Sequence, residues 1–223
     1  VADELPDAFI RLLRSRVKAL DPDGVLLGEV WEDCSDKQGP EGRRGYVNGD
    51  ELDSAMNYPF MDAVQDFLLG RCDAYAFSDR LMAQREWYPA PFYRACLNLL
   101  SSHDVVRAQT ALSGAPSRHT TPREQQATYA PTPEQARLGR ERFLLATAIQ
   151  MFCPGVPCVY YGDEAGLTGM ADPFNRRTYP WGGEDAALQA RVETLLHLRR
   201  DLKALRTGRC RMGALSPAVF GLI

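Results

Sequence analysis

The sequence has no cysteine pattern that would indicate a disulfide framework or a zinc site. Its six cysteines include no Cys-x-x-Cys pair, and no Cys/His cluster has the spacing of zinc ligands. Three of the cysteines lie in apolar runs, as core cysteines do: Cys96, Cys153 and Cys158. This pattern favours a reducing, cytoplasmic location, and we expect no bound metal.

Long apolar runs and basic stripes are also lacking. No run reaches the roughly 18 residues that a membrane-spanning helix needs, and the first seven residues have neither the basic start nor the apolar middle of a signal peptide. With a net formal charge of −3 spread along the chain, nothing indicates a nucleic acid or a membrane as partner. Because residue 1 is not Met, we expect the chain to begin inside a longer protein.

The segments that are present alternate between helical and strand-like patterns. A helical period of apolar residues predicts helices over 6–20, 59–69, 78–94, 133–153 and 185–206. Thr132 is a plausible N-cap for the fourth helix, and Pro89 and Pro91 interrupt the third. Short apolar runs predict strands over 25–31, 52–58, 95–100 and 157–161, with a further strand opening at 218–223. The polar segments 34–50, 113–132 and 162–183 are predicted to be loops.

Strand, loop and helix repeated four times predict parallel strands joined by right-handed crossovers. Such strands form either an open doubly wound sheet or a barrel, and the phosphate-cradling glycine patterns of nucleotide folds are absent. In a barrel, the end where polar residues follow the strands carries the active site. These polar residues are Glu29, Asn57, His103, Asp104, Asp163 and Glu164. A complete barrel needs about 250 residues, so four units predict half of an α/β barrel.

Glu29 is the best single candidate for chemistry. It ends a nearly continuous apolar run, with Trp31 two residues further on. A carboxylate is costly to bury unless it is paired or used. A general acid and a salt-bridged strand terminus are both consistent with this pattern.

Two further clusters of polar residues have a functional and a structural interpretation. His103 and Asp104 would orient a polar substrate, or Asp104 would cap a helix. Asp172 and Arg176, in a loop that also holds Trp181, would grip sugar hydroxyls or brace the loop as a pair. The sequence contains no Gly-x-Ser-x-Gly elbow and no Cys/His dyad in a recognisable setting.

Taken together, these motifs resemble the α-amylase family of glycoside hydrolases, in particular its neopullulanase, cyclomaltodextrinase and maltogenic amylase branch. Four segments in order carry the resemblance to its fifth, seventh and eighth strands and the loop that follows. They are residues 27–32 (LGEVWE), 99–104 (LLSSHD), 154–164 (PGVPCVYYGDE), and 172–176 (DPFNR) with the later Pro180 and Trp181.

The resemblance implies the second half of a (β/α)8 TIM barrel, strands 5–8, over residues 1–208, and the start of a truncated C-terminal β-domain over 209–223. It implies an enzyme that cleaves α-1,4 bonds, with α-1,6 bonds as an alternative, in maltodextrins, cyclodextrins or pullulan, without a cofactor. Glu29 would be the general acid/base and Asp104 the third catalytic carboxylate. The implied substrate-binding residues are Glu4, Trp31, His103, Asp172 and Arg176.

The sequence departs from the family at the nucleophile. The family's nucleophilic Asp ends the fourth strand, and the residues that follow it in this branch are similar to residues 1–7. The nucleophile would therefore directly precede Val1, and Asp3 is not assigned that role. We expect residues 1–223 to be inactive without the N-terminal half of the barrel. A non-catalytic binding or scaffold relative, a transglycosylase of the family and an unrelated α/β domain are the alternatives.

Overall fold

The computed structural model describes residues 2–40 and 42–223 and is built around four short parallel strands. Strand β1 pairs with β4, and β5 pairs with β6. A parallel bridge between Met56 and Leu97 joins the two pairs, so the strands follow one another in chain order. This is the arrangement that repeated right-handed crossovers predict. The strands are β1 (Leu27–Gly28), β4 (Ser54–Ala55), β5 (Leu97–Leu99) and β6 (Val156–Cys158).

The predicted strands are in the right places but are longer than the observed ones. Residues beside a strand are buried as well, as Leu26 and Val30 are beside β1, so an apolar run does not mark where pairing stops. The predicted strand over 52–58 ends early because Asn57 caps the next helix, where its side chain accepts a hydrogen bond from Phe60 N at 3.2 Å.

The predicted helices are present, and the structure adds three short ones. The longer helices are α1 (Asp7–Leu20), α2 (Tyr58–Leu68), α3 (Ala74–Trp87), α7 (Pro133–Phe152) and α8 (Ala186–Asp201). The shorter ones are the 3-10 helix η1 (Ala2–Glu4), α4 (Ala90–Ala95), α5 (Ala108–Leu112), α6 (Arg123–Thr128) and α9 (Lys203–Thr207). The interruption predicted at Pro89 separates α3 from α4. The last predicted helix is divided at Leu202 into α8 and α9.

The segment 113–132 was predicted to be a loop without secondary structure, and this was wrong in part because it contains α6. Prolines at 116, 122 and 131 suggested interruption, yet Pro122 is the N-cap residue of this helix. A proline at a helix start costs no hydrogen bond, since the first N–H groups have no partner there. At the next helix, the N-cap predicted at Thr132 is confirmed by a capping box with Gln135.

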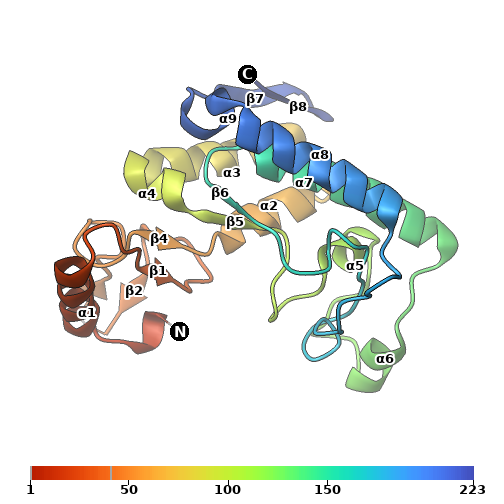
Figure 1. The fold of residues 1–223 in the computed structure, drawn as a ribbon, viewed down its shortest axis with the longest axis horizontal. Helices are drawn as coiled ribbons and strands as arrows, with labels where there is room; N and C mark the ends of the chain where they lie inside the picture. The colour runs from red at the N-terminus through yellow and green to blue at the C-terminus, as the bar shows by residue number, and fades with distance from the viewer. Residues whose placement is uncertain (1, 41) are drawn as a thin grey trace.

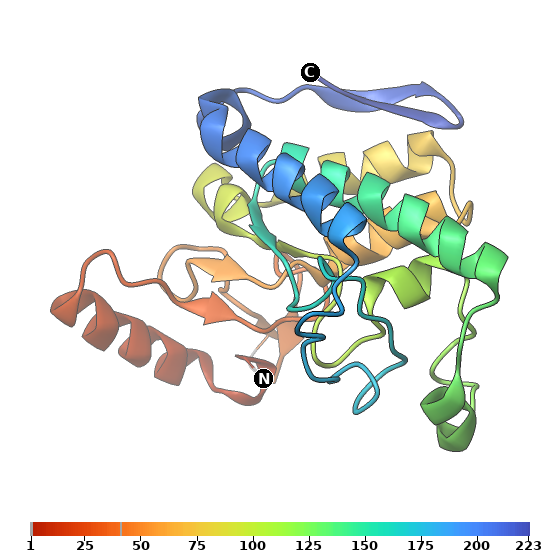
Figure 2. The same ribbon diagram turned by 45° about the vertical axis from the view of Figure 1, so that its right-hand side comes forward.

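Helices α2, α3, α7 and α8 lie together on one side of the strands, whereas α1 lies apart from them beside β1 (Figures 1 and 2). Figures 1 and 2 show α7 and α8 side by side, with α6 and the loop after β6 extending away from them. The core between helices and strands includes Phe60, Val64, Phe77, Leu112 and Phe143. No helix of the described residues is both long and apolar enough to cross a membrane.

Two antiparallel pairs complete the fold. The segment 34–50 was predicted to be a loop, and this was wrong in part because it holds β2 (Gln38–Gly39) and β3 (Gly42–Arg43). Strands of two residues are too short to show an alternating pattern in the sequence. A C-terminal hairpin consists of β7 (Met212–Ser216) and β8 (Val219–Leu222). The hairpin packs on α3, where Ala74 N donates to Pro217 O at 2.8 Å and the rings of Phe77 and Phe220 are 4.7 Å apart. That residues 209–223 begin a separate domain stays a prediction.

Asp185 caps α8 and also ties this helix to α7. Its carboxylate accepts from Leu188 N at 2.9 Å and from both Nε and Nη2 of Arg140 at 2.9 Å. The Arg140 hydrogen bond is the main reason that the pKa of Asp185 is lowered. A lowered pKa means that the stabilisation is fully present above the ordinary Asp value of about 3.9 and is lost as the pH falls from there through the lowered pKa of the folded state.

We predict that Asp185→Ala lowers the free energy of unfolding by about 1–2 kcal/mol at pH 7, because both the cap and the ion pair are lost. Asp185→Asn, which keeps an acceptor for Leu188 N, should lose less. Urea unfolding followed by circular dichroism measures both variants. Asp79→Ala, at an exposed position of α3, is the control and should change stability by less than about 0.5 kcal/mol. Equal stability of Asp185→Ala and the control at pH 7 would contradict this role.

Candidate active site

The polar residues predicted to follow the strands lie at one end of the fold. Glu29 comes directly after β1, and His103 and Asp104 come four and five residues after β5 ends. The charges of Glu29 and Asp104 both act on one phenol, that of Tyr58 at the start of α2. Burial is the main reason that the pKa of Tyr58 is raised, and the two carboxylates raise it further. Glu29 and Asp104 therefore both lie near Tyr58, and their catalytic roles stay predictions.

An aromatic pair lies beside Glu29. The rings of Trp31 and Tyr58 are parallel within 5°, with their centroids 4.1 Å apart. Tyr58 is buried, and its hydroxyl shares a hydrogen bond with Ser102 Oγ at 3.3 Å. Trp31 is only half-buried, so the pair presents a fixed aromatic face to the solvent side of the site. Such a face suits the apolar side of a sugar ring.

His103, Asp104 and Arg176 form a chain of charged groups with Asp172. His103 Nε2 is 3.1 Å from Asp104 Oδ2, and Arg176 Nη2 is 3.6 Å from Asp104 Oδ1. Arg176 Nε also binds Asp172 Oδ1 at 2.5 Å. Asp104 is half-buried and the other three side chains are exposed. The loop after β6 thus reaches back to the end of β5, which the spacing in the sequence did not show.

Asn175 fixes the backbone that carries His103 and Asp104. Its side chain is fully buried, and its Nδ2 donates to the carbonyl oxygens of Ser102, His103 and Val105 at 3.2, 2.9 and 2.7 Å. Three acceptors on one amide leave the loop after β5 little freedom to move. Asp104 N also donates to Ser102 Oγ at 3.2 Å.

A buried ion pair lies beneath these loops. Arg107 Nη1 is 2.9 Å from Asp163 Oδ1, and both side chains are inaccessible to solvent or nearly so. Burial raises the pKa of Asp163 to about 6, although hydrogen bonds from Ser101 and Arg107 oppose the rise. Arg107 also donates to the carbonyl oxygens of Asn175 and Tyr161 at 2.8 Å. One guanidinium therefore connects the end of β5 to two parts of the loop after β6.

Sequence reasoning did not assign roles to Asn175, Asp163, Arg107 or Ser101. Asp163 was noted only as a polar residue after a strand. Asp163 was itself a usable signal, because a carboxylate directly after a buried apolar run is rarely left without a cation nearby. For Asn175 no signal existed, since its three acceptors are backbone atoms of a distant loop.

A cavity of about 410 Å³ opens next to Trp31 and Tyr58. This volume lies within the roughly 300–1,000 Å³ range of small-molecule sites. Its other walls come from α2 and from the segment 113–132, and include Met61, Asp62, Gln65, Val105, Arg118 and His119. Among the described residues, no group of three or more His, Cys, Asp or Glu side chains is arranged to hold a metal ion.

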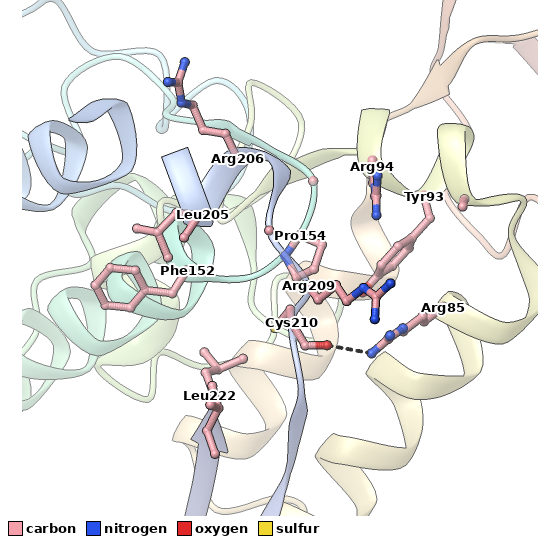
Figure 3. Close-up of a pocket in the computed structure, with 15 residues that line it drawn as sticks. Arg85, Tyr93, Arg94, Phe152, Pro154, Leu205, Arg206, Arg209, Cys210 and Leu222 are labelled. Atoms are coloured by element: carbon pink, nitrogen blue, oxygen red, sulfur yellow. Dashed lines mark hydrogen bonds between the residues drawn. The ribbon is translucent and has the colours of Figure 1, made fainter. Parts of the chain in front are cut away.

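A second pocket, of about 380 Å³, lies at the opposite end of the strands, and Figure 3 shows the residues that line it. Pro154 and Gly155 line it and lie directly before β6. Arg85 Nη1 donates to Cys210 O there at 2.9 Å, and none of the described lining residues is Asp or Glu. In barrels this end serves stability, whereas catalysis belongs to the other end.

Glu4 does not line the cavity beside Trp31. It is exposed, and it borders a separate hollow of about 180 Å³ that Asp7, Pro40 and Arg44 also line. Its predicted contact with a sugar stays a prediction. Asp3 accepts a hydrogen bond from the Tyr46 hydroxyl at 2.9 Å and pairs with Lys37 at 2.9 Å, so it serves as a loop anchor.

Comparison with known proteins gives consistent matches. A model described as the catalytic domain of alpha amylase matches residues 5–207. Amylopullulanase of Thermoanaerobacter thermohydrosulfuricus is 35% identical over 219 residues, covering 93% of this chain and 14% of that protein. A cyclomaltodextrinase of a Bacillus species is 35% identical over 211 residues, covering 93% of this chain and 32% of that protein.

Solved structures are also similar to this chain. Cyclic alpha-maltosyl-(1→6)-maltose hydrolase of Arthrobacter globiformis has a TM-score of 0.80 and 30% identity, covering 98% of this chain and 43% of that one. That hydrolase is also known in complexes with cyclic alpha-maltosyl-(1→6)-maltose and with maltose. The chain spans less than half the length of each of these three relatives.

Substitution of Arg107 tests how much the buried ion pair with Asp163 stabilises the fold. Arg107→Met should lower the free energy of unfolding by about 3–5 kcal/mol, because Asp163 is left buried without its cation. The double variant Arg107→Met/Asp163→Asn should lose less, because no buried charge remains. The control is Arg137→Met, which removes an exposed pair with Glu141 and should cost less than about 0.5 kcal/mol. Arg107→Met within 1 kcal/mol of the unsubstituted chain in urea unfolding would contradict this account.

Proposed function

The chain belongs to the α-amylase family of catalytic domains, and on this basis we propose that it supplies strands 5–8 of the (β/α)8 barrel of an α-glucan hydrolase. The four parallel strands in chain order support this placement. The named activities of the relatives support α-1,4 glucosidic bonds as the target, with α-1,6 bonds as an alternative. Maltodextrins, cyclodextrins and pullulan are the corresponding substrates.

Glu29 is the proposed general acid/base. The observation that carries this proposal is its position directly after β1, beside the Trp31–Tyr58 stack and near enough to Asp104 for both carboxylates to act on one phenol. A proton donor must lie at the edge of a sugar site and share it with other carboxylates. The only other Glu in the same segment, Glu32, is exposed and pairs with Lys37.

The nucleophile is proposed to be a carboxylate directly preceding Val1. In support, Ala2 N donates to Glu29 O at 3.3 Å, so the chain enters the described structure beside the proposed acid. The buried Arg44 holds this entry segment, where its Nη1 and Nη2 donate to Asp3 O at 3.3 Å and to Ala2 O at 3.4 Å. Retaining glycosidases place the two carboxyl groups about 5 Å apart, and a residue adjoining this segment satisfies the topology.

Cleavage would then proceed in two steps, formation and hydrolysis of a glycosyl ester. The nucleophile attacks the anomeric carbon while Glu29 gives its proton to the leaving glycosidic oxygen, which forms a glycosyl ester. Water then attacks the same carbon, Glu29 takes a proton from it, and the ester bond to the nucleophile breaks. No redox cofactor takes part in this proposal.

The charged chain at the end of β5 would grip the sugar at the scissile bond. Asp104 is proposed to bind hydroxyls of that sugar and to stabilise positive charge as it develops, with His103 beside it as a donor. Arg176 and Asp172 would contact sugars further toward the non-reducing end, Trp31 would stack on a ring, and Glu4 would contact the acceptor side. The exposure of His103, Asp172 and Arg176 supports contact with a ligand.

The cysteines support the proposed cytoplasmic location. All six are free thiols. Burial raises the pKa of Cys34, Cys96 and Cys153 to about 12, so these thiols stay protonated and unreactive at neutral pH. They pack as small core residues.

We predict that Glu29→Gln in the full-length gene product lowers kcat by about 10²- to 10⁴-fold, the contribution of general acid/base catalysis. Binding of maltodextrin, measured by calorimetry, should persist, since the amide keeps the shape of the side chain. Glu32→Gln is the matched control and should retain activity. Undiminished turnover by Glu29→Gln would remove this residue from the mechanism, and sugar binding without turnover by the unsubstituted protein would favour a non-catalytic relative.

A second prediction concerns residues 1–223 expressed alone. They should release no reducing sugar from maltodextrin, because the proposed nucleophile is outside this stretch. They should also self-associate, because β1 and β6 would lack the neighbours that a closed barrel provides. Reducing-sugar assays and size-exclusion chromatography with light scattering test both points, and robust hydrolysis by the purified chain would refute the placement of the nucleophile.

A further inference from the structure

The segment 113–132 leaves the end of α5 and lies at the same end of the molecule as Glu29. Figures 1 and 2 show its short helix α6 standing out beside the loop that follows β6. The guanidinium of Arg123, at the start of α6, lies 5.7 Å from the ring of Phe174 in that loop. The segment 113–132 and the loop after β6 are therefore in contact, although they are distant in sequence.

A turn within this segment holds Arg118 in a defined place. The carbonyl oxygen of Ser117 accepts from the backbone N–H groups of Thr120 and Thr121 at 3.2 and 3.1 Å. The side chain of Gln126, in α6, donates to Arg118 O at 3.0 Å and to Thr121 O at 2.8 Å. The helix and the turn thus support one another.

The side chain of Arg118 reaches from this turn to the proposed catalytic residues. Its Nη1 donates to the backbone carbonyl of Asp104, and its Cζ lies 6.0 Å from the centre of the Trp31 ring. Its Nε donates to His119 Nε2 at 3.3 Å. Within residues 2–40 and 42–223, no carboxylate oxygen lies within 4.0 Å of this guanidinium, and its Nη2 has no acceptor. A guanidinium carries five N–H donors, so donors remain for a ligand.

The cavity beside Trp31 has the composition of a sugar-binding surface. Trp31 and Tyr58 supply aromatic rings, and Arg118, His119 and the α2 residues Asp62 and Gln65 supply polar groups. Asp62 accepts and Arg118 donates, so both kinds of hydroxyl interaction are available. Neither Glu29 nor Asp104 lines this cavity. Trp31, two residues after Glu29, and Arg118, which binds the backbone of Asp104, connect it to the residues of the proposed active site.

We propose that Arg118 is a specificity-determining residue that binds the sugar on the leaving-group side of Glu29. This inference rests on the proposed function of Glu29. After the first sugar product departs, the same cavity would receive a sugar acceptor in place of water. The segment 113–132 thereby sets how often the glycosyl group passes to a sugar instead of to water.

The transfer step balances without a further reactant. A hydroxyl oxygen of the acceptor attacks the anomeric carbon of the glycosyl ester, Glu29 takes the hydroxyl proton, and the bond between that carbon and the nucleophile's carboxylate breaks. Arg118 takes no proton. It donates hydrogen bonds to other hydroxyls of the acceptor and so holds the attacking oxygen in place.

The test uses the full-length gene product with 4-nitrophenyl α-maltoside as donor and methyl α-glucoside as acceptor. Chromatography gives the ratio of transfer product to hydrolysis product, and the slope of this ratio against acceptor concentration is compared between variants. Both products come from one glycosyl-enzyme intermediate, so any misfolded fraction of a variant cancels from the slope. Arg118→Met should lower the slope about tenfold, the loss expected for one charge-assisted hydrogen bond.

Arg118→Lys, which keeps a donor without the planar fork, should give an intermediate slope. Arg137→Met, in the exposed surface of α7, is the matched arginine control and should leave the slope unchanged. A slope for Arg118→Met equal to that of the unsubstituted enzyme would overturn the proposal, as would the absence of any transfer product from the unsubstituted enzyme at high acceptor concentration. Persistent formation of both products by Glu29→Gln would instead refute the proposed function.

Discussion

The buried pair of Arg107 and Asp163 is the interaction on which the geometry of the site depends. The loops after β5 and β6 carry the charged residues of the site, and neither loop has regular secondary structure to hold it. Arg107 connects them through Asp163, Asn175 O and Tyr161 O. Burying both charges is expensive, and the cost is offset by further hydrogen bonds to the charged groups, from Ser101 to Asp163 and from Arg107 to two carbonyl oxygens. The three hydrogen bonds donated by Asn175 hold the loop after β5 as well.

Support from these buried groups explains why the exposed residues of the site keep a defined arrangement. His103, Asp172 and Arg176 are open to solvent, where ion pairs alone contribute little to stability. Their backbones, however, are fixed from below by buried groups. Gly169 allows a close backbone contact within the loop after β6, because a Cβ at this position would lie 2.2 Å from Phe174 O. Its carbonyl oxygen also accepts a hydrogen bond from Arg107 N at 3.1 Å. A supported loop of this kind presents side chains in the way that catalysis requires.

The sequence was sufficient for the order of strands and helices, because apolar runs and caps are local signals. It was also sufficient to place Glu29 and Asp104 at the same end of the strands, since parallel strands place the residues after them at one end. It was not sufficient for the supporting network, because Arg107, Asp163 and Asn175 bind side-chain and backbone groups that are 54 to 73 positions away. Helix α6 escaped prediction since a six-residue helix between prolines has too few residues to show a period. The proposed roles of the individual carboxylates, which spacing alone left open, come from the motifs of the α-amylase family.

The central claim is that Glu29 exchanges protons on a glycosyl-enzyme formed by a different carboxylate. The most direct measurement is chemical rescue of Glu29→Ala in the full-length gene product by azide, with 4-nitrophenyl α-maltoside as substrate. Azide needs no deprotonation, so it can replace the water that Glu29 would activate. The account predicts restored turnover and an α-configured glycosyl azide, because azide attacks the glycosyl ester from the face that water uses. A β-configured azide would identify Glu29 as the nucleophile, and absence of rescue would contradict its role as the base.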